Sequence, residues 1–265
     1  MSLTGKTKAS SYKDLLQMNN SNSGVDTTTR NVVDGEGTAS AINVSDDVLL
    51  VQPNNDDTTA AMQVKAKGGT ALLTVDSTNS VVKAGVNQDV VNTQYAYFSV
   101  GQAESSAFLA NTHHPLPFQS ATYSVGNDLP ALGTGTDPAT TFTTAHAANV
   151  TASVLVPVLW RVPDNITIDE IKHFEGADTA TGDTTRMHLM SYTFNSGATG
   201  CLTSGTAIAN TSADNTNAGS EQPYLKDWTI GTADVDAGKV LLCVFRSDSI
   251  NSDYSILVTI KYHLR

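Results

Sequence analysis

The segment from residue 38 to residue 94 contains no aromatic residue, and this constrains the fold more than any other feature of the sequence. Its apolar residues come in short runs, such as Ile42–Val44, Val48–Val51 and Leu72–Val75, separated by Asp, Asn, Gly and Thr. Such runs are typical of short β-strands. Strands with so few large side chains cannot bury enough apolar surface to offset their loss of chain entropy. The segment must therefore pack on another domain or on identical strands of other copies.

We expect residues 38–100 to form a stem of short strands that three copies of the chain build together. Three-fold intertwining supplies the missing core and also pairs the exposed strand edges. Within this stem, Met62, Val64 and Ala66 alternate with polar residues, and Lys67–Thr70 then leads into the next apolar run. The Gly68-Gly69 pair predicts a two-residue hairpin, because both positions can take positive φ.

Residues 1–37 are polar and nearly coreless, which predicts either a disordered tail or an extended arm that orders on a partner. Fully extended, such an arm reaches roughly 115 Å, enough to cross a neighbouring subunit. We expect a short helix over Ser11–Met18, followed by a loop over Asn19–Gly24. The arm carries one apolar cluster, which is the candidate anchoring site: Tyr12, Leu15, Leu16 and Met18.

The C-terminal part, residues 150–265, has fuller apolar runs separated by loops rich in Gly, Asp, Asn and Thr. Strands without helical pattern between them favour an antiparallel β-sandwich of jelly-roll type. Residues 101–149 are then connecting loops and edge strands, with at least one strand expected within Thr140–Val150. The whole chain is predicted to be all-β. The strands expected in the sandwich are Ser153–Val162, Ile166–Phe174, Arg186–Phe194, Lys239–Arg246 and Tyr254–Tyr262.

Composition excludes several classes of function. Charged residues make up 15% of the chain, against about 25% in ordinary domains, so long ion-paired helices are not expected. The net charge of -11 argues against binding nucleic acid or an anionic membrane surface. No apolar run approaches the roughly 20 residues that span a bilayer, and the N-terminus lacks the pattern of a secretory signal. Cys201 and Cys243 do not have C-x-x-C spacing, and nothing in the sequence indicates an oxidising compartment, which favours two free thiols.

The acidic pairs are the first candidates for chemistry. A glycosidase needs two carboxyl groups about 5 Å or about 6.5–9.5 Å apart across a bond, a distance that sequence does not give. Turns use the same residues, and we favour that interpretation. The pairs and clusters are Asp34/Glu36, Asp46/Asp47, Asp56/Asp57 and Asp164/Asp169/Glu170.

Histidine and tryptophan offer further candidates. The six histidines show no spacing typical of metal ligands, and His113 and His114 would point to opposite faces of a strand. A three-fold axis could still gather three copies of one histidine around a metal. Trp160, Trp228 and Tyr224 could stack on a glycan, although buried tryptophan in a sandwich core is the more common use. We therefore predict no catalytic, cofactor-binding or metal-binding residue in the chain itself.

The N-terminal half resembles a known class of protein. The strings TGKTKASSYKDLLQMNNSNSGVDTTTRNVVDGEGTASAINVSDD, VQPNNDDTTAAMQVKAKGGTALLTVDSTNSVVKAG and NTQYAYFSV are similar to virion structural proteins of tailed bacteriophages, especially marine ones. In these proteins an anchoring segment precedes strand-and-turn units, which here fall at Thr38–Asp46 and Gln63–Asp76. The resemblance covers about residues 4–100, and beyond residue 150 only the general sandwich style matches.

The resemblance implies a non-enzymatic, homotrimeric head fibre or capsid decoration protein on the virion surface, made in the host cytoplasm. Its N-terminus would dock to the major capsid protein or to tail or portal proteins, with the C-terminal domain outward. One alternative is a tail fibre or tail-associated receptor-binding protein that contacts host surface glycans. Another is a polysaccharide depolymerase, which would need a carboxylate pair in a groove.

Overall fold

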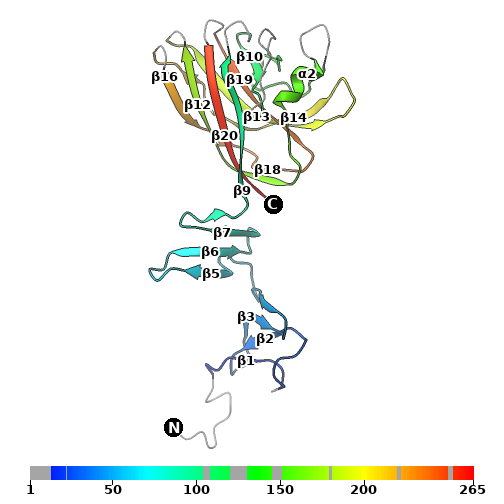
Figure 1. Ribbon diagram of the computed structural model, residues 1–265, viewed down its shortest axis with the longest axis vertical. Helices are drawn as coiled ribbons and strands as arrows, with labels where there is room; N and C mark the ends of the chain where they lie inside the picture. Colours follow the sequence, from blue (N-terminus) through cyan, green and yellow to red (C-terminus); the bar gives the residue numbers. More distant parts are fainter. Residues whose placement is uncertain are drawn as a thin grey trace, which may run out of the picture. The chain divides into compact units, whose positions relative to one another are not determined.

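The protein is described here from a computed structural model, which describes residues 13–21, 23–103, 108–119, 130–144, 151–178, 181–219, 222–249 and 253–265 (Figure 1). The structure is nearly all β, which confirms the predicted fold class. The chain divides into two units, Met1–Val91 and Asn92–Arg265.

The N-terminal unit holds two four-stranded antiparallel sheets, ordered β1-β2-β3-β4 and β5-β6-β7-β8, so each strand pairs with the next in sequence. Such meanders need only local pairing, which suits the short apolar runs of this segment. The first sheet consists of β1 (Gln17–Met18), β2 (Arg30–Val33), β3 (Ala39–Val44) and β4 (Leu49–Val51). The second consists of β5 (Met62–Lys65), β6 (Ala71–Asp76), β7 (Val81–Ala84) and β8 (Asp89–Val90).

The hairpin between β5 and β6 forms where the glycine pair predicts it, but with a longer turn. The N–H of Gly69 donates to the carbonyl of Ala66 (2.9 Å), and the N–H of Ala66 donates to the carbonyl of Thr70 (2.8 Å). Of the two glycines, only Gly69 has positive φ, at 89°. The loop is thus a three-residue turn that ends in a left-handed glycine, which explains the register shift beside Lys65.

The C-terminal unit contains a five-stranded and a seven-stranded antiparallel sheet. The first has the order β16-β12-β20-β9, with β18 paired to β12; the second has the order β10-β19-β13-β14-β17, with β11 and β15 alongside. The five-stranded sheet comprises β9 (Thr93–Ala103), β12 (Ile166–Asp178), β16 (Gln222–Asp227), β18 (Asp234–Val235) and β20 (Asp253–Leu264). The seven-stranded sheet comprises β10 (Thr112–Pro115), β11 (Trp160–Arg161), β13 (Thr184–Phe194), β14 (Leu202–Asn210), β15 (Asn215–Thr216), β17 (Thr229–Ile230) and β19 (Val240–Ser247).

The main core lies between these two sheets, as in a sandwich. In β20, Ser255 and Leu257 are exposed, whereas the four residues predicted to share one face are buried: Tyr254, Ile256, Val258 and Ile260. The predicted alternation in this strand is confirmed. Strands β9, β12 and β20 supply one wall of the core, and β13, β14 and β19 supply the other. The side chains that meet there include Phe98, Ile168, Ile171, Met187, Leu189, Cys243, Phe245, Tyr254, Val258 and Ile260.

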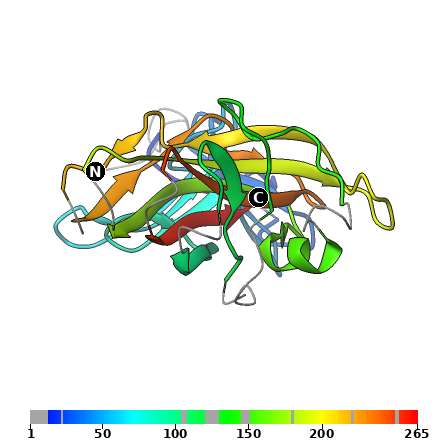
Figure 2. The same ribbon diagram turned by 90° about the horizontal axis from the view of Figure 1, so that it is seen from above.

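The two central strands of the seven-stranded sheet are buried on both faces. In β19 the uninterrupted apolar run Val240–Phe245 is buried throughout, because alternate residues enter the main core and a second cluster. That second cluster contains Leu155 and Val158 of a short helical segment, α2 (Ala152–Leu155) followed by the 3₁₀ turn η2 (Val156–Val158). Figure 2 shows this segment as a green coil beside the strands.

The strand expected over Ser153–Val162 is therefore wrong for most of its length. Only Trp160 and Arg161 are strand residues, paired with β19. Pro157 accounts for the difference, since it has no N–H for a ladder but its fixed φ suits the start of a helical turn. The other four strands predicted for this part of the chain are present as β12, β13, β19 and β20.

Two further predictions can be compared with the structure of the C-terminal unit. Strand β9, which the sequence groups with the stem, pairs with β20 along its length. In the described part of Thr140–Val150, residues 140–144, Phe142 forms a single bridge with Leu202 rather than a strand, and residues 145–150 lie outside the described residues. The jelly-roll connectivity and the three-fold intertwining of the stem remain predictions.

Gly205 of β14 should not accept any side chain. Its N–H donates to the carbonyl of Thr140 (2.8 Å), and a Cβ atom there would lie 2.8 Å from Cδ1 of buried Tyr192 and 2.9 Å from the Thr140 Cα. We expect Gly205→Ala to lower the free energy of unfolding by about 1–3 kcal/mol, because one of the two obstacles is backbone. Chemical denaturation followed by tryptophan fluorescence measures this.

A matched control is Gly176→Ala in β12, where an added Cβ meets no atom within 4 Å. This variant should stay within about 0.5 kcal/mol of the wild type. Equal stability of the two variants would show that the segment around Thr140 moves aside at little cost.

Candidate interaction surfaces and buried polar clusters

The predicted anchoring residues do not form a helical cluster in the part of the arm that the structure describes. Lys13 and Asp14 form a turn, and Met18 lies in β1, opposite Val32. Leu15 and Leu16 are 54% and 62% exposed. The predicted helix is wrong over these residues, because so short a helix without a packed face is marginal in water. Tyr12 lies outside the described residues.

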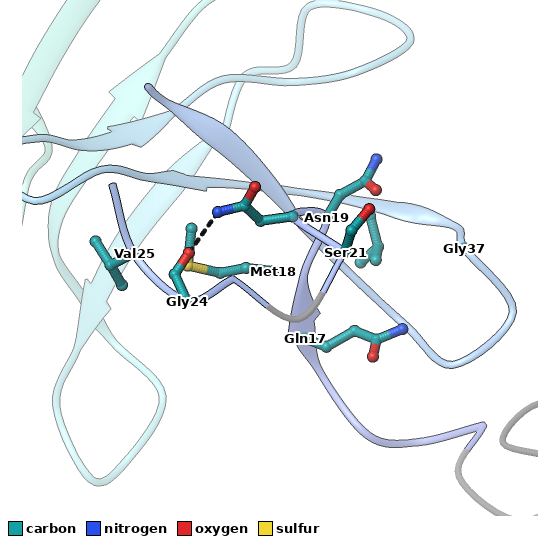
Figure 3. Close-up of a pocket in the computed structure, with 9 residues that line it drawn as sticks. Gln17, Met18, Asn19, Ser21, Gly24, Val25 and Gly37 are labelled. Atoms are coloured by element: carbon teal, nitrogen blue, oxygen red, sulfur yellow. Dashed lines mark hydrogen bonds between the residues drawn. The ribbon is translucent and has the colours of Figure 1, made fainter. Parts of the chain in front are cut away.

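A hollow of ≈ 680 Å³ opens beside β1, and Met18 lines it (Figure 3). Its other apolar walls are Val25, which is exposed, and Val33, which is buried. The loop after β1 closes one side, where the Asn20 side-chain amide donates to the carbonyl of Gly24 (2.6 Å). None of the nine residues that line the hollow is titratable, so it can hold an apolar side chain or a backbone segment but offers no acid–base chemistry.

The second sheet of the N-terminal unit carries two rows of apolar side chains on one face, and that face is uncovered. The register places Met62, Val75 and Val82 in one cross-strand row, with Val64, Leu73 and Ala84 in the next. Met62, Val64 and Val82 are 42%, 45% and 40% exposed, and the other three are only partly buried. We call these six residues the stem face.

The opposite face of the same sheet is mainly polar and internally bonded, although Leu72 and Val81 also lie on it. The Gln63 amide donates to Thr74 Oγ1 (3.3 Å), and that hydroxyl donates to Gln88 Oε1 (2.6 Å). Asp76 accepts from Asn79 (2.9 Å), and Lys83 lies 2.9 Å from the same oxygen. These donors lower the pKa of Asp76 to about 2, with the Asn79 bond the largest cause. The open stem face is thus apolar, whereas the polar side chains named on the opposite face have hydrogen-bond or ion-pair partners.

The C-terminal unit contains a buried polar network that the sequence analysis did not find. Trp228 Nε1 donates to His173 Nδ1 (2.7 Å), so His173 carries its proton on Nε2, which lies 3.3 Å from Glu175 Oε2. Thr185 Oγ1 donates to the other carboxylate oxygen (2.6 Å). All four residues are buried, and Thr185 lies in the opposite sheet, so the network ties the two sheets together. The spacing His-x-Glu in a strand, which places both side chains on one face, is the signal that could have indicated it.

A second polar group lies on the other face of the seven-stranded sheet. His113 and Arg186 both pair with Arg246, one from each side, so the three lie in one cross-strand row. The rings of His113 and His188 meet edge to face at 5.1 Å between centroids. Burial lowers the pKa of His113, and it lowers that of His188 to about 4. Both ring nitrogens of His188 lack a hydrogen bond, although Asp137 lies 3.3 Å away.

The placement of the adjacent histidines agrees with the sequence. His113 faces His188, whereas the ring of His114 lies 6.1 Å from that of Phe245 in the main core, so the two side chains point to opposite faces of β10. His173 and His188 both lie in strands, as predicted.

Most other candidates from the sequence have structural roles. Asp34 accepts from the N–H groups of Glu36 (2.9 Å) and Thr38 (2.8 Å), which confirms the turn interpretation of that acidic pair and lowers the pKa of Asp34. Trp160 and Trp228 are 6% and 8% exposed, so neither provides a glycan platform. Among the other candidates, Asp169 is hydrogen-bonded to His263, and Glu170 forms an ion pair with Lys172. The two cysteines, Cys201 and Cys243, are buried free thiols.

Within the described ranges, no three metal-ligating side chains come together, and no helix is long and apolar enough to cross a membrane. Among the described residues, apolar side chains that are open to a partner lie in the hollow beside β1, on the stem face and on the outward face of the five-stranded sheet, as well as along β4. A scan against protein-family models and a search of curated proteins both found no match for this chain.

Proposed function

We propose that this chain is a non-enzymatic structural subunit of a bacteriophage particle, a head fibre or capsid decoration protein. It acts as a homotrimer that docks to the capsid, or to tail or portal proteins, through its N-terminal residues. The stem strands of three copies intertwine, and the C-terminal unit, of jelly-roll type, points away from the particle. The support comes from the uncovered stem face together with the resemblance of residues 4–100 to phage virion proteins.

The stem face is the observation that carries the proposal. A sheet normally buries its apolar face on its own core and leaves polar residues to water. Here the apolar rows are the open ones, and exposed apolar faces of this kind mark surfaces that meet a partner. A second or third copy of the same sheet supplies a matching apolar face. Closed three-fold symmetry also covers the stem face equally in every copy without a second kind of subunit.

The experiment is the solution mass of the full-length protein by light scattering after size exclusion. We expect three times 27.9 kDa for the wild type. The variant Val64→Asp places a charge on the stem face, in strand β5, which an apolar interface cannot desolvate, and it should shift the mass towards that of one chain. The control is Val86→Asp, which makes the same change at a 78%-exposed residue in the β7–β8 turn and should remain trimeric.

A monomeric wild type would contradict the homotrimer. If the Val64→Asp variant remains trimeric, the interface between copies does not include the stem face. The docking role is tested separately by deleting residues 1–37, which should abolish incorporation into particles while the C-terminal unit still folds. Unchanged incorporation would contradict an N-terminal anchor.

A further inference from the structure

The outward face of the five-stranded sheet carries a second apolar surface. Phe174 of β12 is paired with Leu225 of β16 on one side and with Leu257 of β20 on the other. Paired residues of an antiparallel sheet share a face, so the three side chains form one continuous row. They are 55%, 57% and 43% exposed, although the neighbouring inward residues His173 and Val258 are buried.

Strand β9 extends this surface with aromatic residues. Tyr97 pairs with Thr259, and Tyr95 pairs with Lys261, so both rings stand on the same face as Leu257. They are 43% and 53% exposed. Five large apolar side chains thus cover adjacent positions on four neighbouring strands, and we call them the outer patch.

Ion pairs offset the charges nearest to Phe174 and Leu225. Lys172 lies 2.6 Å from Glu170 and 3.5 Å from Asp227, all three on the outward side, and Lys261 is the other cation there. Asp253 also lies on this face, at the start of β20, so acidic residues slightly outnumber basic ones. In a chain whose total charge is -11, the local ion pairing weakens the repulsion between two copies at this face.

We propose that the outer patch packs against the same unit of a neighbouring copy in the homotrimer. This inference rests on the trimer proposed above and assigns it a second interface. Strand β8 ends at Val90 and β9 begins at Thr93, so a stem that joins three copies holds three outer patches on a very short tether. Tethering raises their effective concentration to the millimolar range, where weak surfaces associate.

The area of this face suits an interface that strengthens an existing trimer, and is too small for one that holds two copies together alone. Four strands about 4.8 Å apart, over outward positions from Ser255 to Lys261 at about 3.3 Å per residue, cover roughly 400 Å². A stable complex buries about 800 Å² on each partner. The outer patch alone is therefore too small to hold a dimer, but it is large enough to strengthen a trimer that the stem already holds.

The test compares two full-length variants that each remove one exposed phenylalanine. Phe174→Ser removes the centre of the outer patch, and Phe194→Ser makes the same change at a 42%-exposed residue at the end of β13, in the other sheet. Sedimentation is measured in urea at which the wild-type trimer dissociates detectably. We expect Phe174→Ser to raise the protein concentration of half-dissociation about tenfold or more, and Phe194→Ser to leave it within about twofold.

Tryptophan fluorescence checks that both variants keep the C-terminal unit folded, because both tryptophans belong to that unit. If the wild type is a trimer and both variants dissociate at the same protein concentration, the outer-patch interface is overturned, whereas the stem trimer is not. A monomeric wild type would overturn both proposals. If a glycan array binds the wild type and Phe174→Ser abolishes that binding without weakening the trimer, the patch serves a sugar ligand and not a second copy.

Discussion

Replacing His173 with leucine should lower the free energy of unfolding of the C-terminal unit by about 3–5 kcal/mol. His173 accepts from Trp228 and lies within reach of Glu175, so its loss leaves a buried indole N–H without an acceptor. It also leaves the carboxylate of Glu175, 3% exposed, with Thr185 as its one donor in the network. A buried donor without a partner costs about 1–3 kcal/mol, and a hydrogen bond to a charged group contributes about 1.5–3 kcal/mol. Both losses occur in the same network, and the change in side-chain packing at position 173 adds to them.

Lys172→Leu is the matched control, one residue away on the outward face of β12. Its ion pairs are exposed and contribute little, so the variant should stay within about 1 kcal/mol of the wild type. Both variants are compared by urea denaturation with tryptophan fluorescence as the signal. A His173→Leu protein as stable as Lys172→Leu would show that water or neighbouring groups satisfy the network without histidine.

The second large effect is a loss of stability in acid that His188 causes. Burial lowers the pKa of His188 from its ordinary value of 6.5 to about 4 in the folded protein. The unfolded chain therefore binds a proton between these two values that the folded protein does not bind. The free energy of unfolding is then highest above pH 6.5 and falls as the pH is lowered towards 4. Each tenfold difference in proton affinity is worth about 1.4 kcal/mol, so this one residue accounts for about 3 kcal/mol.

The His188→Leu variant isolates this contribution from the other titrating groups. Its neighbour Asp137 is 66% exposed at the side chain and keeps its water when the histidine is removed. Urea denaturation at pH 7, 5.5 and 4 should show a flatter pH dependence for the variant than for the wild type. Some dependence should persist, because burial also lowers the pKa of His113. Parallel curves would mean that folding does not lower the pKa of His188.

The strands that the sequence predicts well are those with a strong local pattern. In β20 inward side chains alternate with outward ones, which is a property of the strand itself, since successive side chains point to opposite faces. The inward residues are Tyr254, Ile256, Val258 and Ile260. The unbroken apolar run of β19 likewise indicates a strand buried on both sides. In Val154–Trp160 the apolar run is just as strong, but one proline changes its structure, and weighing that proline requires the packing around it.

The candidate sites divide in a similar way. The exposed apolar residues of the stem follow from a sequence that has too few large side chains for a core of its own. The network of His173, Glu175, Thr185 and Trp228 joins residues up to 55 positions apart, which no local pattern brings together. The outer patch is equally hidden in the sequence, because Leu225, Phe174 and Leu257 become neighbours only through strand register.

The sequence by itself determined the all-β class, the short strands of the N-terminal half and the inward faces of the long strands. These properties depend on side-chain periodicity and turn residues, which act over a few positions. Only the tertiary structure decided that β9 belongs to the sandwich, that both tryptophans lie in a core and not on a glycan-binding surface, and that the outer patch lies open on the five-stranded sheet. Those outcomes depend on which strands pair and in which register, and pairing is set by contacts between distant parts of the chain.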